Sequence, residues 1–256
     1  MSQRVMITAG GSGIGLAIAK AFIDNGARVH ICDVDERALA DAVSKHPQLV
    51  ATHVDVADED AIGKWFDAAM LDLKGLDVLV NNAGVKGPTG YVEDIKLEDW
   101  RSCLQVCLDA QFLCAKQAVP IMKRQRSGSI INISSAAGLF GYGLRTPYAA
   151  AKWAVIGFTK SLAIEVGPFD VRANAICPGT VEGPRMDRVM KAEAEERGVS
   201  IEVVEKELIQ TQSIKRFVKP EEVADMCVFL ASPAAKMVSG QALGVDGHTE
   251  TFHIGN

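Results

Sequence analysis

Short apolar runs alternate with longer stretches of helical periodicity along the chain of 256 residues. The runs are rich in β-branched residues and mostly apolar throughout, which predicts strands that are buried on both faces. The expected strands cover residues 4–8, 27–35, 48–56, 77–82, 129–134, 171–177 and 241–246. The expected helices cover residues 10–26, 36–46, 58–74, about 97–124, 147 to about 166, and 220–231.

Seven strands separated by helices predict an α/β fold in which a doubly wound parallel sheet carries helices on both faces. No repeat, low-complexity tract or linker interrupts the pattern, so we expect a single domain over residues 1–256. The segment 181–212 is charged and breaks the rhythm of the strands. A lid over the substrate and a solvated pair of helices are the two interpretations of this segment, and the lid is preferred.

Composition narrows the class of protein further. Hydrophobic residues make up 48% of the chain, and no apolar run reaches the roughly 18 residues of a membrane span. The N-terminus enters a strand without a signal-peptide pattern, so we expect a cytoplasmic protein without a membrane partner. The net charge of −5 and the scattered basic residues argue against a nucleic-acid partner. The cysteines lack metal-ligand spacing, which predicts reduced thiols and no metal site: Cys32, Cys103, Cys107, Cys114, Cys177 and Cys227.

The stretch from Ser129 to Lys152 carries the candidate chemistry. It begins as an apolar strand, crosses a glycine-rich loop and enters a helix, with Thr146 as the expected cap and Pro147 in the first turn. Tyr148 and Lys152 are four residues apart and share a helix face, so the ammonium group favours the phenolate form of the tyrosine. Such a pair can exchange a proton with a substrate near neutral pH.

Ser135 ends the strand of this stretch, and its hydroxyl can reach across the loop to hydrogen-bond a substrate oxygen. The alternative is purely structural. A Tyr and a Lys four residues apart are common on helices, and a serine at this point can simply cap the strand end. The remaining motifs are therefore needed to choose between the two interpretations.

A glycine-rich turn at residues 8–15 follows the first strand and leads into a helix. Glycines allow the backbone to approach a pyrophosphate, and the helix N-terminus supplies amides that bind it. Asp33 ends the second strand, where a carboxylate can accept both ribose hydroxyls of NAD and repel the 2′-phosphate of NADP. Ser12 and Val34 occupy places where an NADP enzyme would carry Arg or Lys, so we predict NAD. The alternative is that Asp33 is only a turn residue.

These motifs together resemble the classical short-chain dehydrogenase/reductase family, over nearly the whole chain. The resemblance covers the glycine loop at 8–15 with Ala9 for its first glycine, the adenine-binding pair at 55–56, Asn-Asn-Ala-Gly at 81–84, Pro-Gly at 178–179, and Ser135, Tyr148 and Lys152. Because alanine is small, we expect Ala9 to disturb the cofactor-binding loop little. The resemblance implies a doubly wound Rossmann sheet and a nicotinamide cofactor.

The resemblance also implies roles for individual residues. Tyr148 exchanges a proton with the alcohol or ketone oxygen, Ser135 positions that oxygen, and Lys152 lowers the pKa of the tyrosine and holds the nicotinamide ribose. The residues implied to bind the cofactor are Gly11, Ser12, Gly13, Ile14, Gly15, Asp33, Asp55, Val56, Asn82, Ala83, Gly84, Tyr148, Lys152, Pro178, Gly179 and Val181.

The chain departs from the family's pattern at two places. Many relatives carry an Asn in the helix after residue 97, where it helps to hold a water chain leading to the catalytic lysine, and the matching residue here is Cys107. A thiol is a weak donor and acceptor, so we expect a backbone carbonyl or Gln111 to carry the relay, or turnover to be slow. Gly183 stands near the place of a frequent cofactor-binding Thr, for which Thr180 or backbone groups are substitutes.

Three residues near the catalytic stretch are candidates for contact with the substrate. Arg145 precedes Tyr148 by three residues, Arg185 lies at the root of the expected lid, and Tyr142 lies in the glycine-rich loop. Guanidinium groups suit an oxyanion, which points to a small polar substrate that is acidic or sugar-derived. The alternative is that both arginines are solvated or form salt bridges between subunits. The resemblance implies a homotetramer.

The sequence thus predicts an NAD-dependent dehydrogenase that interconverts a secondary alcohol and a ketone, and the oxidation of a small polar hydroxy compound is preferred. One alternative is a biosynthetic ketone reductase such as a 3-oxoacyl reductase, which Asp33 and the acidic segment 181–212 disfavour. Another is an NAD(H)-binding regulatory protein with impaired turnover, for which Cys107 is the one supporting feature.

Overall fold

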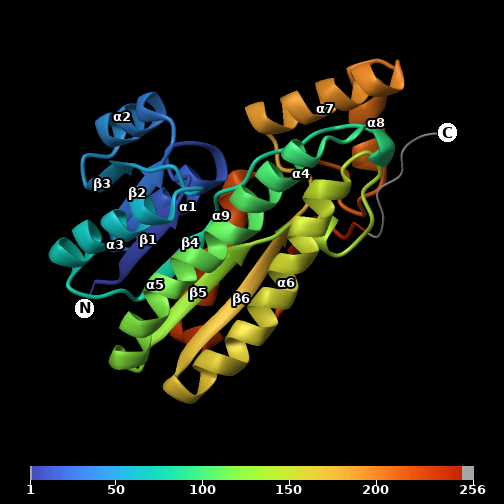
Figure 1. Cartoon of the computed structure of the whole chain (residues 1–256). Helices are drawn as coiled ribbons and strands as arrows, with labels where there is room; N and C mark the ends of the chain where they lie inside the picture. Colours follow the sequence, from blue (N-terminus) through green and yellow to red (C-terminus); the bar gives the residue numbers. More distant parts are fainter. Residues whose placement is uncertain (1, 250–256) are drawn as a thin grey trace.

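The computed structural model describes residues 2–249 and contains one seven-stranded sheet in the order β3-β2-β1-β4-β5-β6-β7 (Figure 1). Every pair of neighbouring strands is parallel, which confirms the doubly wound fold expected from the apolar runs. The strands are β1 (Arg4–Thr8), β2 (Arg28–Asp33), β3 (Leu49–His53), β4 (Val78–Asn81), β5 (Gly128–Ile133), β6 (Val171–Pro178) and β7 (Ala242–Val245).

The helices fill the intervals between these strands. They are α1 (Gly13–Asp24), α2 (Glu36–Lys45), α3 (Glu59–Leu73), α4 (Leu97–Leu104), α5 (Ala110–Gln125), α6 (Thr146–Val166), α7 (Pro184–Arg197), α8 (Ile201–Gln210) and α9 (Pro220–Ala231). Among residues 2–249, none of the helices combines the length and the apolar character that crossing a membrane requires.

Each strand sends alternate side chains to opposite faces of the sheet, and each face has its own core. Met6 of β1 packs with Trp65 of α3 and with buried residues of α5 and α6. Val5 and Ile7 of the same strand point the other way and pack with Phe22 of α1 and with residues of α2 and α9. Burying each of the larger apolar side chains stabilises the fold by about 1.5–3 kcal/mol. Because both faces of the sheet are buried, each strand appears in the sequence as a continuous apolar run.

Two predicted elements differ from those observed. The third strand ends at His53, so Asp55 and Val56 lie in the following loop and do not close the strand. The helix expected over about 97–124 is divided by a π turn, η2 (Gln105–Asp109), between α4 and α5. A π turn inserts one residue without a change of composition, so hydrophobic periodicity gives no signal for it.

The segment 181–212 forms the helix pair α7 and α8, which lies beyond the carboxyl edge of the sheet (Figure 1). The two helices share a small core of their own, made by Met190, Ala194, Val204 and Leu208. An ion pair joins them, because Arg197 of α7 contacts Glu207 of α8 at 2.7 Å. The pair is therefore a packed unit, and its closure over a substrate stays a prediction.

Two helical glycines give a matched test of how closely α1 packs against the loop that follows β1. A Cβ at Gly15 would lie 2.0 Å from the Ala9 carbonyl oxygen, whereas a Cβ at Gly63 in α3 would meet nothing within 4 Å. We expect Gly15→Ala to lower the free energy of unfolding by about 1–3 kcal/mol through this overlap, and Gly63→Ala to raise it by about 0.5–1 kcal/mol. Urea unfolding followed by circular dichroism measures both. Equal effects of the two substitutions would contradict the close approach.

Candidate active site

A cavity of about 530 Å³ opens at the carboxyl ends of the strands. The chain leaves β1 toward β2 and β3 on one side and returns to β4 on the other, so the loops after β1 and β4 diverge. Such a switch in strand order is where ligands bind in open α/β sheets. Residues from both loops border the cavity, including Ser12, Gly13, Asn82 and Gly84.

The loop after β1 is held by one side chain from the end of β2 and one from the loop after β4. The Asp33 carboxylate accepts a hydrogen bond from the Gly11 backbone N–H at 3.0 Å. The Asn82 side-chain amide donates to the carbonyl oxygens of Thr8 and Ala9 at 3.1 and 3.0 Å. These contacts fix the loop that leads into α1, whose free N-terminal amides form a site for anions.

The shape of this loop fits a dinucleotide. Gly13 has φ +52, and a Cβ built on it would meet nothing within 4 Å, so a side chain here would project into open space beside the loop. Asp33 and Asp55 border the same cavity as the loop, where they can face ribose and adenine. Ala9 also has a left-handed backbone, with φ 50. An alanine in this conformation costs about 1–2 kcal/mol relative to a right-handed one. The replacement of glycine by alanine at this position therefore strains the backbone, although the alanine side chain is small.

Tyr148 and Lys152 lie in the first turns of α6, as predicted. The helix itself begins one residue earlier than expected: Thr146 is its first residue, and Arg145 occupies the cap position without a side-chain cap hydrogen bond. Pro147 still lies in the first turn, where its missing N–H costs nothing. The Lys152 ammonium is buried, donates to the Ile133 carbonyl oxygen at 2.8 Å, and lies 5.6 Å from the centre of the Tyr148 ring.

The charges around Tyr148 determine its acidity. Burial alone raises the pKa of its phenol, because an apolar environment disfavours the charged form. The positive charges of Lys152 and Arg185 and a hydrogen bond with Ser135 outweigh this effect, so the pKa of Tyr148 lies below its usual value of 10. A tyrosine in this environment is suited to take a proton from a hydroxyl group.

Cys107 lies in the π turn between α4 and α5, and its thiol lies 3.6 Å from the Val85 carbonyl oxygen. A hydrogen bond from Cys103 and the charge of Lys152 lower the pKa of Cys107 below its usual value, although burial opposes this shift. The Gln111 amide donates to the carbonyl oxygens of Cys107 and Ile133 at 3.3 and 3.2 Å. Gln111 therefore contacts the carbonyl group that also holds Lys152, and its part in a relay stays a prediction.

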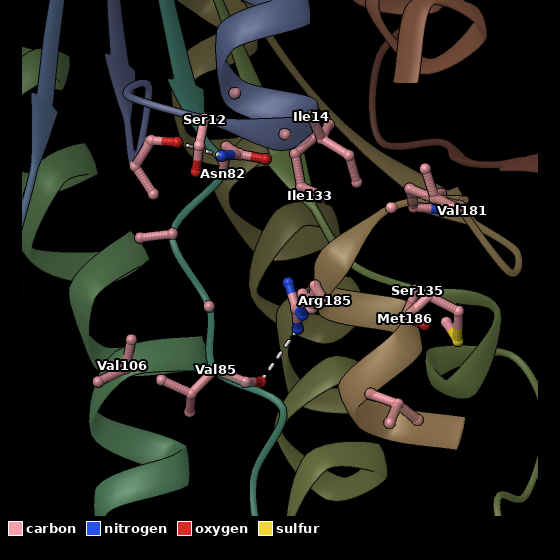
Figure 2. A pocket seen from close by; sticks show the side chains of 18 of the residues that line it. Ser12, Ile14, Asn82, Val85, Val106, Ile133, Ser135, Val181, Arg185 and Met186 are labelled. Carbon is pink, nitrogen blue, oxygen red and sulfur yellow. Dashed lines mark hydrogen bonds between the residues drawn. The ribbon is translucent and has the colours of Figure 1, made fainter. Parts of the chain in front are cut away.

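The three residues proposed for substrate contact surround Tyr148. The Arg145 guanidinium lies between two rings, 5.3 Å from the centre of Tyr142 and 5.0 Å from that of Tyr148. Arg185 lies 5.9 Å from the Tyr148 ring and donates to the Val85 carbonyl oxygen at 3.0 Å (Figure 2). Both arginines and Tyr142 border the cavity.

All the residues that the sequence nominated for catalysis, cofactor and substrate border this one cavity, apart from Gly11. The Gly11 backbone N–H donates a hydrogen bond to Asp33, which does border the cavity. The cavity wall also contains residues that the sequence did not nominate, among them Val54, Val106, Met186, Arg188 and Val189. The preferred lid interpretation of segment 181–212 was the available signal for Met186, Arg188 and Val189, but it did not show which side chains of the segment face the cavity.

Comparisons with known proteins agree with this geometry. A family model described as Enoyl-(Acyl carrier protein) reductase matches residues 8–248. The D-beta-hydroxybutyrate dehydrogenase of Cupriavidus necator is 35% identical over 250 residues, which are 96% of either chain. The 3-oxoacyl-[acyl-carrier-protein] reductase FabG of Thermotoga maritima is 36% identical over 94% of this chain and 95% of its own. The trans-4-hydroxycyclohexanecarboxylate dehydrogenase of Sinomonas cyclohexanicum is 36% identical over 96% of this chain and 93% of its own.

Solved structures show the same fold. An NAD⁺-bound xylitol dehydrogenase superposes with a TM-score of 0.93 at 26% identity, covering 96% of this chain and 98% of that one. A variant of the actinorhodin polyketide ketoreductase with NADPH superposes with a TM-score of 0.92 at 32% identity, covering 96% of both chains. Fold, cavity and relatives together define a nicotinamide-dependent oxidoreductase. The chain belongs to the short-chain dehydrogenase/reductase family.

The phenol of Tyr148 is open to a direct test. We expect Tyr148→Phe to lower kcat by about a hundredfold or more, because no other group takes over a lost acid/base. The affinity for the nicotinamide cofactor should change little, since the ring and the Lys152 ammonium remain. Steady-state kinetics and cofactor titration by fluorescence separate the two effects. Unchanged kcat in the variant would show that the proton goes elsewhere.

Proposed function

We propose that this protein is an NAD-dependent dehydrogenase that oxidises the secondary alcohol of a small polar hydroxy compound. The observation that carries the proposal is the arrangement around Tyr148. Its phenol has a lowered pKa and lies beside the Lys152 ammonium, with Ser135 in hydrogen-bond contact. This is a base placed for a substrate hydroxyl at the end of a cavity that fits a dinucleotide.

Each of the three residues performs a separate task in this reaction. Ser135 donates its hydroxyl hydrogen bond to the substrate oxygen, and Tyr148 as phenolate accepts the proton of the substrate hydroxyl. Lys152, fixed by the Ile133 carbonyl oxygen, stabilises the phenolate by its charge. A nicotinamide cofactor bound in the cavity supplies the acceptor for the hydride of the carbinol carbon.

The choice of NAD rests on Asp33. Its carboxylate borders the cavity after β2, and the next residue is the exposed and uncharged Val34. A 2′-phosphate at this place would meet the negative charge of Asp33, and no lysine or arginine of the glycine loop or of the end of β2 borders the cavity to offset it. The solved structures contain NAD⁺ in one case and NADPH in the other, so this chain's own residues decide the proposal.

Removing the charge of Asp33 tests this choice. Asp33→Asn keeps an oxygen that can accept from the Gly11 N–H, so the loop should persist while the repulsion disappears. We expect the preference for NAD over NADP, measured as a ratio of kcat/KM, to fall by about a hundredfold. Asp41→Asn is the matched control, because it removes one carboxylate from the exposed face of α2. A wild-type enzyme that prefers NADP would refute the assignment outright.

An acidic or sugar-derived substrate is supported by the arginines around Tyr148 and by the names of relatives. Two similar dehydrogenases are named for hydroxybutyrate and hydroxycyclohexanecarboxylate, each a hydroxy acid. The xylitol dehydrogenase is named for a polyol. A second function, a biosynthetic ketone reductase, is supported by the similarity to the 3-oxoacyl reductase and to the polyketide ketoreductase.

Nicotinamide absorbance at neutral pH separates these functions. The purified protein is given NAD or NADP with sugars, polyols and hydroxy acids, and NADH or NADPH with 3-oxoacyl thioesters, with Tyr148→Phe as control. We expect NAD-linked oxidation of a hydroxy compound that the variant has lost. Faster reduction of 3-oxoacyl thioesters with NADPH would favour the second function. Binding of NAD without any turnover would favour a regulatory protein.

We also propose that the protein is a homotetramer in the cytoplasm. The support for assembly is the surface formed by α5 and α6, where Phe112, Trp153 and Ile164 expose much of their side chains. Phe112 and Phe158 stack edge to face across these two helices. Large apolar side chains left on neighbouring helices favour burial against another chain.

A further inference from the structure

Arg145 is a buried cation without a carboxylate partner. The residue is 2% exposed, and none of the ion pairs among residues 2–249 includes it. One terminal nitrogen donates to the Lys86 carbonyl oxygen, while the buried Nε has no hydrogen-bond partner within the described part of the chain. Burying a charge in this way costs free energy unless an anion joins it.

The charges at this end of the cavity are predominantly positive. Lys152, Arg185 and Arg188 border it together with Arg145. The nearest buried carboxylate, Glu193 of α7, accepts from the Tyr142 hydroxyl at 3.4 Å and does not border the cavity. It shares Arg197 with Glu207, at 3.0 and 2.7 Å. Glu182 also borders the cavity but is exposed at the root of α7. A bound anion would therefore meet several cations at the catalytic end.

We propose that Arg145 and Arg185 form a carboxylate-binding subsite beside Tyr148, and that the substrate is a short-chain hydroxycarboxylate. This inference rests on the proposed dehydrogenase function and names its substrate class. The two guanidinium groups approach the same Tyr148 ring, at 5.0 and 5.9 Å from its centre. A carboxylate held by both lies only a few bonds from a hydroxyl group that contacts the phenol.

The surroundings favour a carboxylate over a neutral sugar. The guanidinium fork of an arginine matches the two oxygens of a carboxylate and gives charge-assisted hydrogen bonds. A polyol offers no charge, and its binding would leave the buried Arg145 cation without an opposite charge. Met186 and Val189 of α7 supply an apolar wall against which a short carbon chain can pack.

The alternative for Arg145 is a structural role. Its hydrogen bond to Lys86 and its contacts with the two tyrosine rings tie together three segments of the chain. If Arg145 has only a structural role, its substitution would change the activity toward acids and toward their neutral analogues equally. The ratio of activities toward an acid and its ester therefore separates recognition from folding, and it cancels any influence of the arginines on the pKa of Tyr148.

The test uses 2-, 3- and 4-hydroxycarboxylates of up to six carbons, each beside its methyl ester, with NAD as cofactor. We expect the wild-type enzyme to oxidise at least one acid with a kcat/KM at least about tenfold above that of its ester. Arg185→Gln and Arg145→Gln should remove most of this preference. Lys191→Gln is the matched control, since it removes one positive charge from the exposed face of α7 and should keep the preference. Arg185 is exposed, so its variant is informative even where Arg145→Gln fails to fold.

The failures of the two proposals are distinguishable. Oxidation of polyols or esters without a preference for acids, or an acid preference that survives Arg185→Gln, would overturn the carboxylate subsite and leave the dehydrogenase intact. If no alcohol is oxidised, the proposed function fails, and a binding measurement then tests the carboxylate subsite by itself. Saturable quenching of bound NADH fluorescence by butyrate, but not by butyramide, would then support the subsite. Equal effects of the two probes would overturn it.

Discussion

The buried ammonium group of Lys152 is the interaction on which the active site depends. It lies at the carboxyl end of β5, where the Ile133 carbonyl oxygen accepts its hydrogen bond, and no ion pair among residues 2–249 includes it. A cation buried in this way stabilises whatever negative charge comes close to it. The Tyr148 phenolate is the first group that this charge stabilises. The same positive field, enlarged by Arg145 and Arg185, makes the catalytic end of the cavity receptive to an anionic substrate.

The cavity is electrically asymmetric along its length. Asp33 and Asp55 border the part next to the glycine loop, and the lysine and arginines border the part next to α6 and α7. The N-terminus of α1 lies between these parts and favours phosphate. A dinucleotide is itself asymmetric, with hydroxyl-bearing ribose at one end, phosphates in the middle and the reactive ring at the other. The arrangement of charges therefore favours one orientation of a bound dinucleotide.

The fold was predictable because the strands are buried on both faces, which makes each an unbroken apolar run. The pairing of Tyr148 with Lys152 was predictable because it is local to one helix. The burial of Arg145 was not, since it depends on Lys86, which is distant in the sequence. The start of α6 at Thr146 and the end of β3 at His53 depend on tertiary contacts of single residues. The wall supplied by α7 required the position of a helix pair that no local pattern encodes.

The π turn at Gln105–Asp109 constrains the length of the chain between two packed helices. Successive residues of an α-helix are rotated by about 100° around the axis. Deleting one residue here would restore a regular helix but turn α5 by that angle relative to α4. Either the contacts of α5 with the sheet or those of α4 with α6 would then be lost. The number of residues in this turn is therefore constrained more tightly than the identity of its side chains, including that of Cys107.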